Sequence, residues 1–82
     1  MMNLYEASER KARKNKVFNI VSVPNVGLLQ NIGLRANTKV SVRNKYGLGG
    51  PVLLRVEDAF AVAIGKDIAT QIIVEEALKN GE

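Results

Sequence analysis

Apolar and polar residues alternate along three stretches in the second half of the chain. In residues 38–45, 52–57 and 60–64, apolar side chains recur at every second position, and the other face of the last stretch carries only alanines. Successive side chains of a strand point to opposite faces of a sheet, so this period of two predicts three strands. Val40 and Val42 are expected to face inward. One face of the second stretch carries Val52, Leu54 and Val56, and one face of the third carries Phe60, Val62 and Ile64, with both sides of that third strand expected to be covered or crowded.

Two further segments are apolar and β-branched. Residues 17–23 are rich in valine, isoleucine and phenylalanine and stop at Pro24, which predicts a buried first strand. Residues 72–74 predict a short last strand, and the polar residues 75–82 are expected to be loosely helical. Five short strands with closely spaced turns are typical of a small barrel, because closure of the sheet removes its exposed edges.

A short helix is predicted between the first two strands. Val26, Leu29 and Ile32 recur at helical spacing, and Asn25 precedes them as the expected N-cap. Gly33 stands where the helix would end in a left-handed residue, with an apolar leucine following it. A helix of two turns is not stable alone, so its apolar face is expected to dock on the sheet.

Residues 46–51, with the sequence YGLGGP, predict the connection of a hairpin. Glycine permits a positive φ in the turn, and Pro51 begins the next strand without needing a backbone donor. A phosphate-binding loop would need a helix directly after its glycines, whereas a proline and a strand follow here. Residues 65–69 predict a single helical turn.

Length and composition are those of one globular domain. The chain has 82 residues, of which 46% are hydrophobic and 24% charged, with a formal net charge of +4. The N-terminus lacks the apolar region of a signal peptide, and no apolar run approaches the roughly 20 residues of a membrane-spanning helix. We therefore expect a chain without membrane insertion, and the absence of cysteine fits a reducing compartment.

The basic excess is concentrated near the N-terminus. The run RKARKNK, residues 10–16, holds five of the twelve lysine and arginine residues. Residues 1–15 are interpreted as a basic leader, residues 16–76 as the folded domain and residues 77–82 as a polar tail. A solvated arm is the favoured interpretation of the basic run, since charge runs are weak motifs.

Catalytic chemistry has few candidates in this chain. Histidine and cysteine are absent, which excludes nucleophile systems that depend on them and any general base with an unperturbed pKa near neutrality. Glu57 and Asp58 could offer oxygen to a hard cation, but two adjacent carboxylates are too few for tight binding. We predict no enzymatic activity, no cofactor and no metal site.

The ordered set of segments resembles the FeoA family of small bacterial proteins. The resemblance rests on LQNIGL at residues 29–34, the VSV strand at 40–42, and the hairpin LGGPVLLRVE at 48–57, and it covers about residues 16–76. It implies a mainly β fold, a small SH3-like barrel of about five strands with a short helix inserted after the first. It also implies a non-enzymatic role in ferrous iron uptake, as a cytosolic partner of the transporter FeoB and its GTP-binding domain. Such a protein would be cytoplasmic, at the inner face of the cell membrane through its partner.

A partner-binding surface is expected on the helix and on the hairpin connection. Two apolar residues suffice to dock two helical turns, which leaves Leu28 available, and a hairpin loop has little interior to fill. The residues predicted to contact the partner are Leu28, Gln30, Asn31, Arg35, Lys45, Tyr46 and Leu48.

Two other functions stay open from the residues. A small barrel with a basic leader could bind nucleic acid through Lys11, Arg13 and Lys14, although no aromatic residues interleave there to stack on bases. A metal-responsive regulatory interaction domain is the third hypothesis, with only carboxylates and carbonyls available as ligands; the family resemblance adds that similar domains occur at the C-terminus of iron-responsive repressors. Self-association into a homo-oligomer is neither indicated nor excluded.

Overall fold

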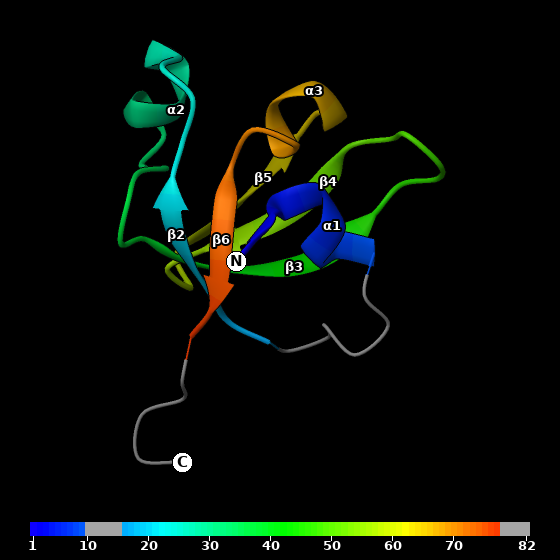
Figure 1. Ribbon diagram of the computed structural model, residues 1–82, viewed down its shortest axis with the longest axis horizontal. Helices are drawn as coiled ribbons and strands as arrows, with labels where there is room; N and C mark the ends of the chain where they lie inside the picture. Colours follow the sequence, from blue (N-terminus) through cyan, green and yellow to red (C-terminus); the bar gives the residue numbers. More distant parts are fainter. Residues whose placement is uncertain (10–15, 78–82) are drawn as a thin grey trace.

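The computed structural model describes residues 1–9 and 16–77, which form one antiparallel sheet with short helices at its ends (Figure 1). The strand order in the sheet is β1-β6-β2-β3-β4-β5. Along the chain the elements are β1 (Met2–Asn3), α1 (Leu4–Glu9), β2 (Phe18–Ser22), α2 (Gly27–Asn31), β3 (Lys39–Lys45), β4 (Val52–Val56), β5 (Phe60–Ile64), α3 (Lys66–Ala69) and β6 (Ile73–Glu76). The predicted mainly β class is confirmed, as is a short helix after the first predicted strand.

In the part of the chain that the structure describes, the sheet bends strongly but does not close. β2 and β6 cross over β3, β4 and β5 in Figure 1, and the register shifts at Ile20/Ser22 and at Val42/Asn44. Such irregularities add a local kink and twist, which lets one sheet wrap around a core. β1 and β5 are the two outer strands, and no pairing joins them within residues 1–9 and 16–77. The expected closure of a barrel is therefore not detected.

The apolar residues that alternate along the sequence are the ones that the structure buries in the core. Val52, Leu54 and Val56 of β4 are at most 1% exposed, and they pair with Ile64, Val62 and Phe60 of β5 on the same face. Phe18 and Ile20 of β2 are fully buried against them. The side chains expected inward on β3 are confirmed, as is the apolar face of β4. On β5 the expectation that both sides are covered is wrong in part, because the alanine face is exposed and Phe60 is 41% exposed at the edge of the sheet.

The first nine residues contribute to the core. β1 pairs with β6, and Leu4 is fully buried while its N–H donates to the carbonyl of Ile72 at 2.7 Å. α1 begins with a reciprocal cap: the N–H of Glu6 donates to Asn3 Oδ1 at 2.8 Å, and the N–H of Asn3 donates to Glu6 Oε1 at 3.1 Å. Such a cap satisfies two donors that the start of a helix would leave unpaired. Residues 10–15 of the predicted basic leader lie outside the described residues.

The predicted boundaries of α2 are partly right. The N-cap is Val26, with extended backbone and no side-chain cap bond, so the assignment to Asn25 was wrong by one residue. The C-terminal prediction is confirmed, because Gly33 has a φ of 89°. Its N–H donates to the carbonyl of Gln30, and the N–H of Leu34 donates to Leu29. These two bonds satisfy carbonyls of the last turn and constitute a Schellman motif.

The last strand extends further than expected. Glu75 and Glu76 belong to β6 and pair with Asn19 and Phe18 of β2, so their assignment to a loosely helical segment was wrong. Residues 78–82 of that segment lie outside the described residues. β2 supplies a long antiparallel neighbour, and this pairing overrides the low strand propensity of glutamate.

Candidate functional site

An open apolar groove of about 280 Å³ lies between α2, β5 and α3. The two helices stand at one end of the molecule in Figure 1, and β5 runs up to α3 there. The lining residues are Val26, Leu28, Leu29, Ile32, Val62, Ala63, Ile64, Gly65 and Ile68. No charged side chain is among them, so the groove offers shape and apolar area to a partner rather than catalytic groups.

Local structure explains why α2 leaves apolar surface exposed. Leu29 is 4% exposed and docks the helix on the core, whereas Leu28 projects at the margin of the groove and is 66% exposed. The Schellman motif at Gly33 ends the helix after five residues. The prediction that Leu28 is available at the surface is confirmed.

Three of the polar residues predicted to bind a partner lie on α2 and on the turn that follows it. Gln30, Asn31 and Arg35 are exposed and together line a second, polar hollow of about 450 Å³. With Leu28 they form a continuous part of the predicted partner surface, which we call the α2 face (Leu28, Gln30, Asn31 and Arg35). A partner that contacts the α2 face would meet an apolar side chain next to amide groups and one guanidinium group.

The other predicted residues are not near the α2 face. Figure 1 places α2 at the upper left and the connection between β3 and β4 at the right of the molecule. Tyr46 is 49% exposed and Leu48 is 98% exposed on that connection. The structure therefore divides the predicted partner residues into two separate surfaces, because the strands β3 and β4 extend away from the end that carries α2.

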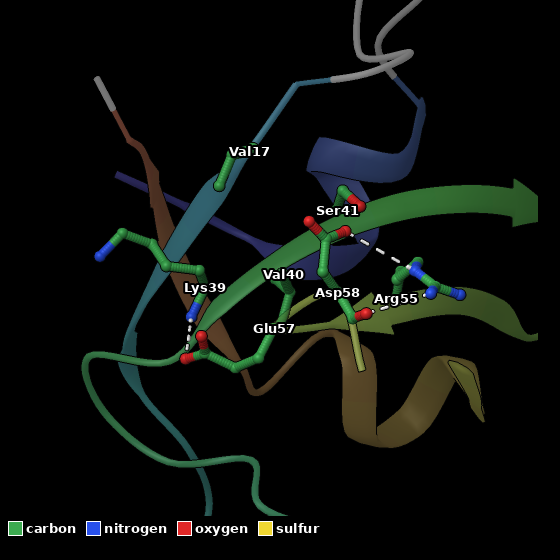
Figure 2. A pocket seen from close by; sticks show the side chains of 7 residues that line it. All are labelled: Val17, Lys39, Val40, Ser41, Arg55, Glu57 and Asp58. Atoms are coloured by element: carbon green, nitrogen blue, oxygen red, sulfur yellow. Dashed lines mark hydrogen bonds and ion pairs between the residues drawn. The ribbon is translucent and has the colours of Figure 1, made fainter. Parts of the chain in front are cut away.

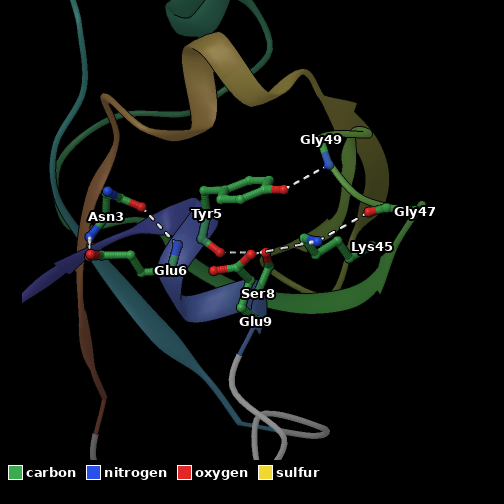
Figure 3. Close-up of polar contacts among 8 residues, drawn as sticks. All are labelled: Asn3, Tyr5, Glu6, Ser8, Glu9, Lys45, Gly47 and Gly49. Atoms are coloured by element: carbon green, nitrogen blue, oxygen red, sulfur yellow. Dashed lines mark hydrogen bonds and ion pairs between the residues drawn. The ribbon is translucent and has the colours of Figure 1, made fainter.

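Lys45 is engaged within the chain. Its ammonium group donates to the carbonyl of Gly47 at 3.1 Å, lies 3.8 Å from Glu9 Oε2, and sits 4.8 Å from the centre of the Tyr5 ring. Figure 3 shows these groups gathered between α1 and the β3–β4 connection. Lys45 thus connects the loop to α1 through these contacts, whereas Tyr46 and Leu48 face solvent.

Tyr5 joins α1 to the same loop. Its hydroxyl oxygen accepts a hydrogen bond from the N–H of Gly49 at 3.0 Å, across 44 positions of sequence (Figure 3). This backbone hydrogen bond is the main reason that the pKa of the Tyr5 phenol lies below its usual value, and Lys45 and Lys66 lower it further. Burial opposes the shift. Sequence reasoning missed this contact, although the Asn3-x-x-Glu6 spacing was a usable signal for the helix that carries it.

The carboxylates considered as cation ligands belong to a turn. Glu57 Oε2 accepts a hydrogen bond from the N–H of Lys39 at 3.1 Å, and Asp58 Oδ1 lies 3.7 Å from Arg55 Nε (Figure 2). Both acidic residues have positive φ angles and connect β4 to β5. In the described part of the chain, no three histidine, cysteine or acidic residues are grouped as metal ligands.

Two further sequence hypotheses meet the structure only in part. Of the basic run, Lys16 is described, and its ammonium group lies 3.1 Å from Glu76 on β6. The lysine and arginine residues proposed to bind nucleic acid lie outside the described residues. Among residues 1–9 and 16–77, no helix has the length and apolar character needed to cross a membrane.

Comparisons with known proteins agree on one family. The model of the FeoA domain matches residues 2–76, whereas no curated protein sequence matches the chain. The NMR structure of a FeoA-like protein from Clostridium acetobutylicum aligns with a TM-score of 0.69 at 18% identity, covering 99% of this chain and 92% of that one. The crystal structure of an iron uptake regulatory protein (FeoA) gives 0.69 at 21% identity, covering 93% and 96%. The solution structure of a FeoA protein from Chlorobium tepidum gives 0.71 at 24% identity, covering 92% and 73%.

Proposed function

Because the chain belongs to the FeoA domain family, we propose that it binds the cytosolic domain of a FeoB-like ferrous iron transporter and adjusts its transport. Members of the family are non-enzymatic accessory proteins of ferrous iron uptake. A protein with that role acts by contact with its partner, so its surface must present apolar or polar groups that the partner can bind. In this proposal the chain works in the cytosol, beside the membrane that holds its partner.

The α2 face and the adjoining groove carry the proposal. Leu28 is 66% exposed on a helix whose neighbouring groove is lined by apolar side chains. Interfaces commonly have an apolar centre with a polar rim, and Gln30, Asn31 and Arg35 would supply the rim here. Burial of a whole leucine side chain is worth about 1.5–3 kcal/mol. Covering the exposed two thirds of Leu28 would therefore contribute about 1–2 kcal/mol, or about five- to thirtyfold in affinity.

The test is the affinity of the full chain for a purified FeoB cytosolic domain, measured by calorimetry. We expect Leu28→Asp to weaken binding at least about tenfold, because it places a carboxylate in the apolar centre of the interface. Leu28→Met retains the apolar volume and should bind like the wild type.

Arg43→Gln is the matched charge control. It lowers the net charge by the same one unit as Leu28→Asp, at an exposed position on β3. Unchanged affinity for Leu28→Asp would remove the α2 face from the interface. A loss of affinity in Arg43→Gln equal to that in Leu28→Asp would show that net charge, and not apolar contact, determines binding.

A further inference from the structure

The loop between β3 and β4 exposes one apolar side chain almost completely. Residues 47–50 have the sequence GLGG, so Leu48 is their one side chain, and it is 98% exposed. A single exposed leucine is common on protein surfaces and needs no functional explanation. What distinguishes Leu48 is that contacts on both sides of it hold its loop in one conformation.

Three hydrogen bonds fix this loop. The N–H of Tyr46 donates to the carbonyl of Pro51 at 3.0 Å and closes the base of the loop. Lys45 Nζ donates to the carbonyl of Gly47, on one side of Leu48. On the other side, the N–H of Gly49 donates to the Tyr5 hydroxyl, which is itself held on α1 (Figure 3). The two residues next to Leu48 are thus tied to the body of the protein.

The backbone of the loop also depends on its glycines. Gly47 and Gly49 have φ angles of 65° and 77°, which L residues with side chains rarely adopt. At Gly50, a Cβ atom would collide with the backbone carbonyl of Tyr46. The conformation of the loop therefore depends on its glycines, which carry no side chain, as well as on the hydrogen bonds. An ordered loop loses less entropy on binding than a flexible one, so its side chain is prepared to act as an anchor.

We propose that Leu48 inserts into an apolar pocket with an acidic rim on the transporter's cytosolic domain, and that Tyr5 is the positioning residue which holds its loop for that contact. This inference rests on the proposed function and adds a second contact remote from the α2 face. The acidic rim follows from Lys66, which is exposed and whose ammonium group lies 5.2 Å from the centre of the Tyr5 ring at the base of the loop, whereas Lys45 is already paired with Glu9. A second copy of this chain would present the same positive group, so a partner with carboxylates fits the loop better.

A double-mutant cycle tests the positioning role. Affinity for the FeoB cytosolic domain is measured with the wild type, Leu48→Ala, Tyr5→Phe and the double variant. We expect Leu48→Ala to weaken binding about tenfold or more, as for an apolar anchor. Tyr5→Phe retains the ring but loses the acceptor of the Gly49 N–H, and should weaken binding about threefold to tenfold. The double variant should bind no more weakly than Leu48→Ala, because Tyr5 contributes to affinity only by positioning Leu48, and that side chain is already removed.

A readout without any partner accompanies the cycle. Hydrogen exchange by NMR should show faster exchange of the Gly49 amide in free Tyr5→Phe, because that N–H loses its acceptor. Tyr46→Phe is the matched control, since it removes a hydroxyl from the other tyrosine, an exposed residue of the same loop. Neither affinity nor Gly49 exchange should change in Tyr46→Phe.

Three contrary outcomes are distinguishable from failure of the proposed function. If Leu48→Ala leaves the affinity unchanged while Leu28→Asp lowers it, the proposed function stands and the Leu48 anchor is wrong. If Tyr5→Phe weakens binding equally with and without Leu48, or leaves Gly49 exchange unchanged, Tyr5 does not position the loop. If Leu48→Ala alters self-association in sedimentation but not the affinity for FeoB, the occupant is a second copy. Absence of any binding by the wild type would overturn both proposals.

Discussion

Two glycines that flank α2 offer a matched test of how this helix ends. Gly27 is its first residue, and Gly33 follows its C-cap with a φ of 89°. An added Cβ at Gly27 would have no atom within 4 Å, and at Gly33 its nearest neighbour would be Phe60 Cζ at 4.0 Å, an ordinary contact. Neither Gly27→Ala nor Gly33→Ala creates a clash, so the two variants differ in backbone conformation alone.

The expected effects have opposite signs. Gly27→Ala reduces the conformational freedom of the unfolded chain at a position that alanine can adopt, and should raise the free energy of unfolding by about 0.4–1 kcal/mol. Gly33→Ala forces an L side chain into the left-handed region of backbone conformation and should lower the free energy of unfolding by about 1–2 kcal/mol. For a domain of this size, each kcal/mol corresponds to a shift of about 4–8 °C in Tm.

Urea unfolding followed by circular dichroism measures both variants, with the slope of the transition as a check that the unfolded state is unchanged. Gly33→Asn is a useful third variant, because asparagine populates positive φ more readily than alanine and should fall between Gly33→Ala and the wild type. If Gly33→Ala were as stable as Gly27→Ala with equal slopes, the Schellman motif would contribute nothing to this fold. Another feature, and not the Schellman motif, would then end α2.

Three further perturbations follow from individual contacts. Leu54→Ala removes a fully buried side chain from β4 and should lower the free energy of unfolding by about 2–5 kcal/mol; a thermal melt with unchanged Tm would contradict this. The pKa of Tyr5 is lowered in the folded chain from 10.0, so the stability of the wild type relative to Tyr5→Phe should rise as the pH is raised toward 10.0; parallel pH profiles would exclude that coupling. Gly50→Ala would place a Cβ atom against the Tyr46 carbonyl, so the loop must move and break the hydrogen bond between the Gly49 N–H and Tyr5. The Gly49 amide resonance should then be displaced in NMR spectra, whereas a resonance at the wild-type position would contradict this.

Features that depend on neighbours along the chain were predictable. The alternation around Val40 and Val42 places these side chains in the core, because a strand exposes its two faces in turn. Gly33 was predictable as the end of α2, since glycine tolerates a left-handed conformation that other residues resist. Asn37 in the next turn has a φ of 74°, a conformation that asparagine tolerates better than most residues.

Features that depend on distant pairing were not predictable from the same patterns. Glu75 and Glu76 were interpreted as part of a polar tail from their sequence, and only their pairing with β2 identifies them as strand residues. Tyr5 lies in a segment interpreted as a leader, and nothing local to it indicates Gly49 as its partner. The side of the apolar groove that β5 and α3 form was missed for a related reason. Ile68 and Val62 come from separate elements, and only the packing of α3 beside β5 brings them together.

The sequence by itself determined the five predicted strands, the short helix with its glycine stop, and the absence of histidine and cysteine chemistry. Each of these follows from residue type and spacing over a few positions, where backbone geometry is decided locally. Only the tertiary structure decided that Leu28 and Leu48 stand on separate surfaces, that Tyr5 holds the loop of Leu48, and that β5 is an outer strand of the sheet within the described residues. These arrangements depend on which strands pair, and pairing is a competition among distant segments for the same buried surface.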